Sequence, residues 1–133
     1  MGIKFMEERI FTISEATNLL PQLEEVLTEV KRLRKFLVSI ETEIKKASGH
    51  ATQSGGSPFG PSYLKTLERI IKNIEQINEM GVLVKDLDKG LCDFAYRMDG
   101  RVVYLCWKLG EAEIGWWHET SAGFSGRQAL EKE

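Results

Sequence analysis

The sequence predicts an α+β fold in which a long antiparallel, coiled-coil-like helical hairpin packs on a four-stranded antiparallel β-meander. Two observations support this prediction. Apolar residues recur every three or four positions over much of residues 12–80, which is the spacing of a helical seam. After Gly81 the sequence changes to short alternating runs separated by turn residues, which is typical of an antiparallel sheet.

The composition is that of one ordinary globular domain. The 133 residues include 42% hydrophobic and 29% charged residues, which is enough for a substantial core. We therefore expect a single domain over residues 1–133, with the helical hairpin at 12–80 and the sheet and C-terminal tail at 81–127. Lys and Arg total 18 against 20 Asp and Glu, a net charge of -2, which argues against non-specific binding to nucleic acid or anionic lipid.

Nothing in the sequence indicates contact with a membrane. No run approaches the roughly 18 consecutive apolar residues of a membrane span. The start MGIKFMEERIF lacks the apolar core and the cleavage site of a signal peptide. We therefore expect a cytoplasmic protein.

A capping box is expected at the start of the helical hairpin, with the Thr12 hydroxyl accepting a backbone N–H and Glu15 reaching back. Pro21 then lies inside the apolar pattern. Either a short helix ends at Leu20 or a single helix bends at this point. Because the first turn of a new helix is the easier position for proline, we favour a helix that starts after Pro21.

Two long helices are thus expected, over residues 22–47 and 62–80, joined by a mobile loop at 48–62 that is rich in Gly, Ser and Pro. The apolar seams of the two helices are Leu23, Val26, Val30, Leu33, Leu37, Ile40 and Ile44, and Tyr63, Leu67, Ile70, Ile74 and Ile77. The second helix is too short to cover the start of the first. We expect the sheet to cover that part of the hairpin.

Four strands are expected, at residues 82–86, 91–98, 101–107 and 112–118. Asp99-Gly100 is the strongest turn signal, because a type I′ turn requires positive φ at both central residues. This turn places Cys92 opposite Trp107 and makes one face of the sheet almost entirely apolar.

The other connections specify the pairing of the strands less firmly. If LDKG closes with a left-handed Gly90 as a bulge, Lys85 lies opposite Asp93. Cys92 and Cys106 point to opposite faces, so a disulfide between them would require backbone movement.

The register of the last strand stays open. A two-residue turn at Gly110-Glu111 would put Trp116 and His118 on the apolar face and Trp117 on the wetter face. A three-residue loop would reverse these assignments.

His118 has a structural and a functional interpretation. The structural one is a hydrogen-bonded imidazole, because buried polar groups need partners whether or not they carry out chemistry. The functional one makes His118 a general base, oriented by carboxylates, beside an arginine that clamps an anion. The residues of that second interpretation are His118, Asp93, Glu111, Glu119 and Arg127.

Motifs for other sites are missing. The sequence contains no HExxH, no paired CxxC, no P-loop and no Gly-x-Ser-x-Gly elbow, and His50 lies in the mobile loop. We therefore expect no metal site and no cofactor.

Basic residues flank both helical seams, at Lys31, Arg32, Arg34, Lys35, Lys65, Arg69 and Lys72. Because no aromatic residues for base stacking are interleaved with them, we do not expect nucleic acid as a partner. Phe36 and Val38 are left over from the intramolecular seam and favour a helical homodimer.

The stretches GVLVKDLDKGLCDF, YLCWKLGEAEIGWWH and AGFSGR, with FTISEATNLLPQL near the start, resemble a prokaryotic family known as domain of unknown function number 2203. The resemblance covers nearly the whole chain except residues 48–62 and implies no activity. The positions that it implies recur in the family are Asp86, Gly90, Asp93, Phe94, Trp107, Gly110, Glu111, Trp117, His118, Gly123, Phe124, Gly126 and Arg127. Turn formation or packing explains about half of these positions.

The remaining polar residues give the candidate site. Candidate catalytic residues are His118, Glu111 and Asp93, and candidate ligand-binding residues are Asp86, Arg127 and Trp117. The leading hypothesis is a cytoplasmic interaction or scaffold protein that acts as a homodimer through its helical hairpins. The alternative is a small-molecule or anion-binding protein, or an enzyme, that uses Glu111, His118 and Arg127 at one end of the sheet.

Overall fold

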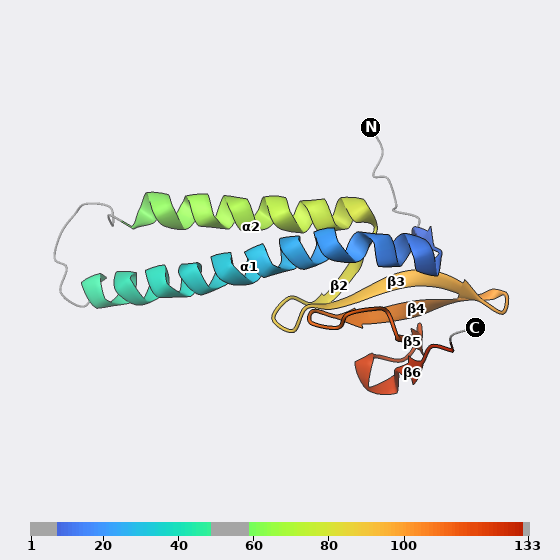
Figure 1. The fold of residues 1–133 in the computed structure, drawn as a ribbon. Helices are drawn as coiled ribbons and strands as arrows, with labels where there is room; N and C mark the ends of the chain where they lie inside the picture. Colours follow the sequence, from blue (N-terminus) through green and yellow to red (C-terminus); the bar gives the residue numbers. More distant parts are fainter. Residues whose placement is uncertain (1–7, 49–58, 132–133) are drawn as a thin grey trace, which may run out of the picture.

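The computed structural model describes residues 8–48 and 59–131 and has the predicted α+β class (Figure 1). Helices α1 (Ile13–Ser48) and α2 (Gly60–Met80) run antiparallel, and the sheet lies beside one end of this hairpin. The sheet elements are β1 (Ile10–Phe11), β2 (Leu83–Asp86), β3 (Leu91–Met98), β4 (Arg101–Lys108), β5 (Trp116–Glu119) and β6 (Gln128–Ala129), with the short 3-10 helix η1 (Phe124–Gly126) between the last two.

The start of α1 confirms the capping box and corrects the position of the helix. The backbone N–H of Thr12 donates to Glu15 Oε1 at 2.8 Å, and that of Glu15 donates to Thr12 Oγ1 at 3.0 Å. Pro21 lies inside one continuous helix, so the expectation of a new helix after it was wrong. A proline in a helix costs about 3 kcal/mol, and the unbroken helix offsets this cost by burying Leu20 and Leu23 on one face.

The predicted loop was too long at its C-terminal side. Helix α2 begins at Gly60 instead of residue 62, with a proline in its first turn, where the missing N–H costs nothing. Residues 49–58, which make up most of the predicted mobile loop, lie outside the described residues. The helix ends as predicted at Gly81, whose φ of 83° is left-handed.

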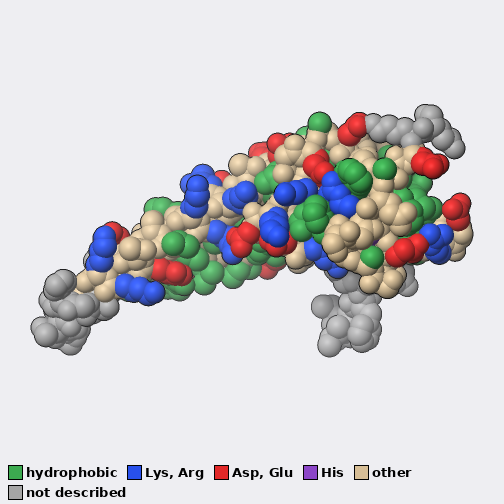
Figure 2. All heavy atoms as spheres, turned by 90° about the horizontal axis from the view of Figure 1, so that it is seen from below, with side chains coloured by type: hydrophobic (Ala, Val, Ile, Leu, Met, Phe, Trp, Pro, Cys, Tyr) green, Lys and Arg blue, Asp and Glu red, His purple; other side chains and the backbone are tan. Residues whose placement is uncertain are grey.

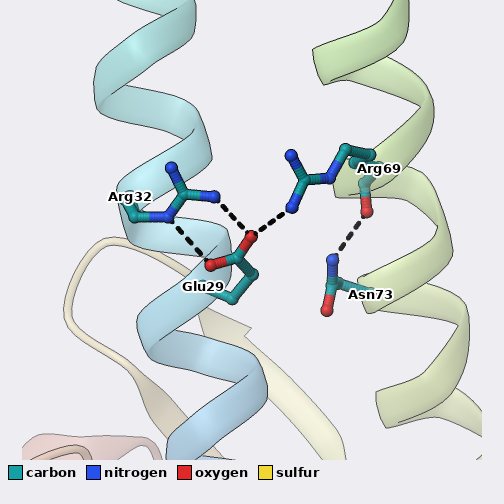
Figure 3. A network of polar contacts seen from close by, with 4 residues as sticks. All are labelled: Glu29, Arg32, Arg69 and Asn73. Carbon is teal, nitrogen blue, oxygen red and sulfur yellow. Dashed lines mark hydrogen bonds and ion pairs between the residues drawn. The ribbon is translucent and has the colours of Figure 1, made fainter.

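The predicted seams face one another in the hairpin, and every seam residue is buried or half-buried. Polar contacts also join the two helices (Figure 3): Glu29 on α1 accepts hydrogen bonds from Arg32 and, at 2.8 Å, from Arg69 on α2. In the described part of the chain, neither helix combines the length and apolar character needed to cross a membrane.

The sheet is larger than predicted and mixed instead of purely antiparallel. Strands β2, β3, β4 and β5 pair antiparallel in sequence order, as expected for the meander. Two further two-residue strands extend it: β1 pairs parallel with β3, and β6 pairs antiparallel with β5. Such short strands have no periodicity that a sequence pattern could reveal.

The structure confirms the strand pairing predicted from one of the two tight turns and corrects the pairing predicted from the other. The Asp99-Gly100 turn has positive φ at both residues, and the predicted pairing of β3 with β4 is confirmed over its whole length. Gly90 is left-handed as predicted. However, the pairing of Lys85 with Asp93 was wrong, and Leu83 lies opposite Asp93 instead. Asp86 pairs with Leu91 at the turn, and the register shifts again between Val84 and Asp86.

The apolar face of the sheet packs on the N-terminal half of α1 and the C-terminal end of α2, as predicted. This core contains Leu20, Leu23, Leu27, Ile77, Met80, Cys92, Phe94, Leu105, Trp107 and Ile114. The opposite face, here called the outer face, carries Asp93, Tyr104 and Cys106. Cys92 and Cys106 therefore lie on opposite faces, and both are free thiols.

The pairing of β5 answers the question of the last register. The chain between β4 and β5 is a longer connection than either turn considered, and the strand begins at Trp116 instead of residue 112. Trp117 pairs with Leu105 and packs against the core, whereas His118 pairs with Tyr104. His118 therefore lies on the outer face.

Candidate functional site

Three chemically active side chains from three adjacent strands meet on the outer face of the sheet. Asp93 on β3 is paired with Cys106 on β4, and His118 on β5 lies diagonally next to Cys106. Because alternate residues of a strand share a face, this pairing aims all three side chains the same way. All three are buried, with 2%, 2% and 3% of their surface exposed, respectively.

The hydrogen bonds of His118 fix its tautomer. Its Nδ1 atom lies 2.8 Å from the carbonyl oxygen of Glu119, and a carbonyl only accepts, so Nδ1 carries a proton. Its Nε2 atom lies 3.0 Å from Asp93 Oδ2. Nε2 is therefore the ring atom that faces Asp93.

Burial governs the charges in this cluster. Desolvation raises the pKa of Asp93, while the hydrogen bond and the charge of His118 lower it in part. Burial also raises the pKa of the Cys106 thiol, and the negative charge of Asp93 adds to this effect, against a smaller lowering by Arg127. In the absence of another cation, Cys106 is therefore a neutral thiol.

Glu111 and Arg127 form a second, adjoining group. Arg127 Nη2 donates to Glu111 Oε2 at 2.6 Å, and the guanidinium carbon lies 4.4 Å from the ring centroid of Trp116 and 4.5 Å from that of Phe124. Glu111 also accepts from the backbone N–H of Lys108 at 2.7 Å. These contacts tie the connection after β4 to the C-terminal segment.

A cavity of about 320 Å³ opens onto the three-residue cluster. Asp93, Cys106 and His118 form part of its lining, and the segment from Thr120 to Phe124 forms another part. Tyr104 stands beside His118, with 5.6 Å between the ring centroids. Exposed Lys85 also lines the cavity and places its Nζ atom 5.5 Å from the Tyr104 ring centroid.

The other predicted site residues do not join the cluster. Asp86 lines the same cavity, but its carboxylate accepts the backbone N–H of Lys89 at 3.0 Å and so closes the turn before β3. Trp117 lies on the helix-facing side of the sheet. Glu119 pairs with Arg101 through its side chain and contributes only its carbonyl to the cluster.

Sequence reasoning therefore identified Asp93 and His118 but missed Cys106. We considered Cys106 only as a disulfide partner. The confirmed β3–β4 register already places it directly opposite Asp93, so this pairing of a thiol with a carboxylate was the available signal. Because the register of β5 was left open, the sequence did not show that His118 lies on the same face of the sheet as Asp93 and Cys106.

The geometry separates two kinds of chemistry. A cysteine nucleophile needs a histidine nitrogen to take its proton, with the other nitrogen held by an orienting group. Here the Glu119 carbonyl occupies Nδ1 and Asp93 faces Nε2, so neither nitrogen is reserved for the thiol. By contrast, one nitrogen, one oxygen and one sulfur atom lie within 4.8 Å of one another, which is the donor set of a transition-metal site.

Comparison with known proteins gives a family but no activity. The profile of a family described as "Uncharacterized conserved protein (DUF2203)" matches residues 9–130, which include every residue of the cluster. No curated protein and no solved structure matches the chain.

Proposed function

We propose, for a chain that belongs to the DUF2203 family, that the protein binds a divalent transition-metal ion through Asp93, Cys106 and His118. The observation that carries the proposal is the convergence of their ligand atoms within 4.8 Å in a buried position. This proposal replaces the expectation of no metal site. That expectation rested on missing sequence motifs, whereas these ligands come from three separate strands.

The spacing of the donor atoms fits a metal ion. Two ligands at about 2.0–2.1 Å from a zinc ion, separated by a tetrahedral angle, lie about 3.3 Å apart. The His118 Nε2 and Asp93 Oδ2 atoms are 3.0 Å apart. Small side-chain movements would therefore admit the ion between atoms that otherwise bond to each other.

The surroundings of His118 also support the proposal. A metal-bound histidine usually donates its second ring N–H to a carboxylate or a backbone carbonyl, which fixes the tautomer and orients the ring. The Nδ1–H of His118 donates to the Glu119 carbonyl. The nitrogen left for the metal is Nε2, which faces Asp93.

The donor types select the class of metal. A thiolate and an imidazole favour zinc and similar transition metals over Mg²⁺ or Ca²⁺, which prefer oxygen ligands. Three protein ligands leave one position of a four-coordinate ion open, as in catalytic zinc sites. Because the three ligand residues line the cavity described above, a water molecule or a ligand could reach the open position.

The two cysteines provide a matched test. The wild type, Cys106→Ala and Cys92→Ala would be stripped of metal and titrated with Zn²⁺ and Co²⁺, following thermal unfolding and the thiolate-to-Co²⁺ absorption band. Cys92 is equally buried but lies on the helix-facing side, so its variant controls for loss of a buried thiol. At a metal concentration 100 times the Kd, specific binding would add about 2.7 kcal/mol to the free energy of unfolding.

The expected result is stabilisation and a thiolate band in the wild type and in Cys92→Ala, with both lost in Cys106→Ala. Equal stabilisation of all three proteins would place the metal elsewhere and overturn the proposal. A wild type that gives neither signal would also overturn it.

Self-association through the helical hairpin is a second candidate, and a specific observation favours it. Leu64 and Ile71 lie seven residues apart on α2, with 61% and 48% of their surface exposed, so they share one face of the helix. Phe36 and Val38 on α1 are also exposed. A second copy of the chain could cover the face formed by Leu64 and Ile71, as the prediction of a homodimer requires.

Light scattering at several protein concentrations would test this candidate. We expect a dimer for the wild type and a monomer for the double variant Leu64→Glu with Ile71→Glu. Lys65→Glu changes an already polar position of the same helix and serves as the control. A wild type that remains monomeric at every concentration would refute the homodimer.

The expectation that nucleic acid is not a partner stays a prediction, and the charges on the surface of the hairpin support it. Figure 2 shows basic and acidic side chains interspersed along the hairpin. Several of the basic residues flanking the seams pair with acidic ones, as Arg32 and Arg69 do with Glu29, and Arg34 with Asp88. Paired charges offer less to a phosphate backbone than free ones.

A further inference from the structure

We infer that an acidic amphipathic helix of another protein docks in a groove between α1 and the sheet, with its apolar face on the floor and its carboxylates against Lys31 and Lys35. Residues 28–41 of α1 supply most of the lining, and Asp88 and Leu109 complete it. No residue of this lining belongs to the cluster on the outer face. The inference therefore does not depend on the proposed metal site.

The groove is long enough for a helix. The loops at one end of the sheet lie beneath the middle of α1 and form one wall (Figure 1). Arg34 pairs with Asp88 at this junction, which fastens the turn before β3 to the helix. The lining extends from residue 28 to residue 41 of α1, about 20 Å at 1.5 Å per residue, so about four turns of a partner helix could lie along it. The space has a volume of about 820 Å³.

The floor of the groove is apolar and partly open to solvent. Val38 lines it with 60% of its surface exposed. Leu37 and Leu109 line the same space and are half-buried. An apolar groove of this kind recognises the apolar face of an amphipathic helix, whose anchor residues recur every three or four positions.

The rim of the groove carries an excess of positive charge. The lining includes four basic side chains and two acidic ones, namely Lys31, Arg32, Arg34, Lys35, Glu41 and Asp88. Ion pairs with residues outside the lining leave this excess unchanged, because Arg32 shares Glu29 with Arg69. Glu24 lies one turn before Thr28 on the same face of α1, and counting it reduces the excess without cancelling it.

Lys31 and Lys35 are the cations that a partner can reach. Both are exposed, and neither forms an ion pair with a residue in the ranges 8–48 and 59–131. They lie four residues apart, so they project from neighbouring turns of one helix face, and Val38 continues this face. A partner helix with carboxylates four residues apart and an apolar residue on the next turn matches all three positions.

The lining favours this partner over two other occupants. A second copy docked symmetrically through the groove would bring Lys31 and Lys35 against the same basic residues. Nucleic acid would use the charges of the rim but not the apolar floor. None of the described residues that line the groove is aromatic, so bases would have no ring on which to stack. An acidic amphipathic helix uses both the rim and the floor.

Fluorescence anisotropy of labelled peptides on the full-length protein tests the inference. The probe is an Ala-rich helical peptide of about 15 residues, long enough for the groove, with Leu along one face and flanking Glu residues four positions apart. Its counterpart carries Lys in place of each Glu. A chelator is present throughout, so the outcome does not depend on a metal ion.

Two pairs of variants separate the groove from the rest of the surface. Lys31→Glu with Lys35→Glu reverses the rim, and Lys65→Glu with Lys72→Glu makes the same change in net charge on α2. Val38→Asn makes the floor polar. Its control is Phe36→Asn, which removes an exposed apolar side chain that does not line the groove. All these positions are exposed, and circular dichroism checks that each variant keeps the fold.

The acidic peptide is expected to bind the wild type and both controls saturably, and the basic peptide about tenfold more weakly. Reversal of Lys31 and Lys35 should weaken the acidic peptide about tenfold and strengthen the basic one, because the charges of the rim now match the other peptide. Val38→Asn should weaken the acidic peptide several-fold through loss of apolar burial.

Three results would overturn the inference. The first is equal binding of the two peptides, or an equal loss in the groove variants and their controls. The second is single-stranded RNA that displaces the acidic peptide and binds Val38→Asn as well as the wild type, which would assign the groove to nucleic acid. The third is a change of oligomeric state, seen by light scattering, on reversal of Lys31 and Lys35, which would make the groove a contact between copies of this chain.

Discussion

His118 Nε2 lies 3.0 Å from Asp93 Oδ2 on the outer face of the sheet, and both side chains are almost completely removed from solvent. A buried polar pair of this kind is stabilising only while both members are satisfied. Without a metal ion, the two side chains bond to each other. Variants of the metal-free protein can therefore separate the structural role of the pair from metal binding.

The first prediction concerns which partner can be replaced. Asp93→Asn should change the unfolding free energy little in the presence of a chelator, because the Asn amide can donate to the Nε2 lone pair. His118→Ala should lower it by about 2 kcal/mol or more, since it leaves a buried carboxyl group without its partner. Urea denaturation at neutral pH measures both. Equal destabilisation by the two substitutions would contradict the assigned tautomer.

The same site shows how far sequence reasoning reached. Asp99-Gly100 specified the β3–β4 register, because only a few residue pairs accept positive φ twice, and this register already brought Asp93 opposite Cys106. The face of His118 could not be predicted in the same way. The connection between Leu109 and Gly115 is irregular and too long for a tight turn, and a change of one residue moves every side chain of the strand to the other face.

The errors elsewhere have physical causes of a similar kind. Pro21 breaks the local helical preference, yet the tertiary burial of its neighbours outweighs the lost hydrogen bond. The pairing of Asp86 with Leu91 at the turn and the register shift between Val84 and Asp86 together move Lys85 away from Asp93, and no side-chain pattern encodes these backbone details. Strands β1 and β6 form because the edges of β3 and β5 offer them backbone hydrogen-bond partners. Two residues are too few to show an alternating sequence pattern.

The second prediction compares two left-handed glycines in turns of the sheet. At Gly100, with φ of 80°, an added Cβ would meet open space, so Gly100→Ala should cost about 1–2 kcal/mol from backbone strain alone. At Gly90, with φ of 68°, the Cβ would lie 2.5 Å from Leu109 Cβ. Gly90→Ala should therefore be clearly more destabilising. Denaturant unfolding of both variants measures this, and similar losses would show that the Leu109 contact relaxes freely.

The third prediction is a pH dependence at the start of α1. The backbone hydrogen bond from Thr12 holds the pKa of Glu15 below its ordinary value of 4.5. A carboxylate with a lowered folded-state pKa stabilises the protein above its unfolded-state pKa, and this contribution disappears as the pH falls through the folded-state value. Glu15→Gln should therefore be less stable than the wild type at pH 7, and the difference should shrink below pH 4.5.

The control for that experiment is Glu24→Gln, an exposed carboxylate of the same helix outside its first turn. Its stability difference from the wild type should not follow the same course with pH. Unfolding measured by circular dichroism over a series of acidic buffers gives both curves. A difference for Glu15→Gln that stays constant down to the lowest pH would contradict the role given to the capping box.

The last prediction concerns Arg127, which stacks between Trp116 and Phe124 and pairs with Glu111. Arg127→Ala should loosen the C-terminal segment, because these contacts hold it together with the short pairing of β5 with β6 and the packing of Leu130 on the core. Arg127→Lys keeps the charge but not the planar stacking, so its effect should be intermediate. Hydrogen exchange read by mass spectrometry should show faster exchange in the segment after β5, including the Leu130 N–H that donates to Gly115, and unchanged exchange in the hairpin. Acceleration spread evenly over the molecule would instead mean that Arg127 stabilises the whole fold and does not specifically fasten the segment that covers the site.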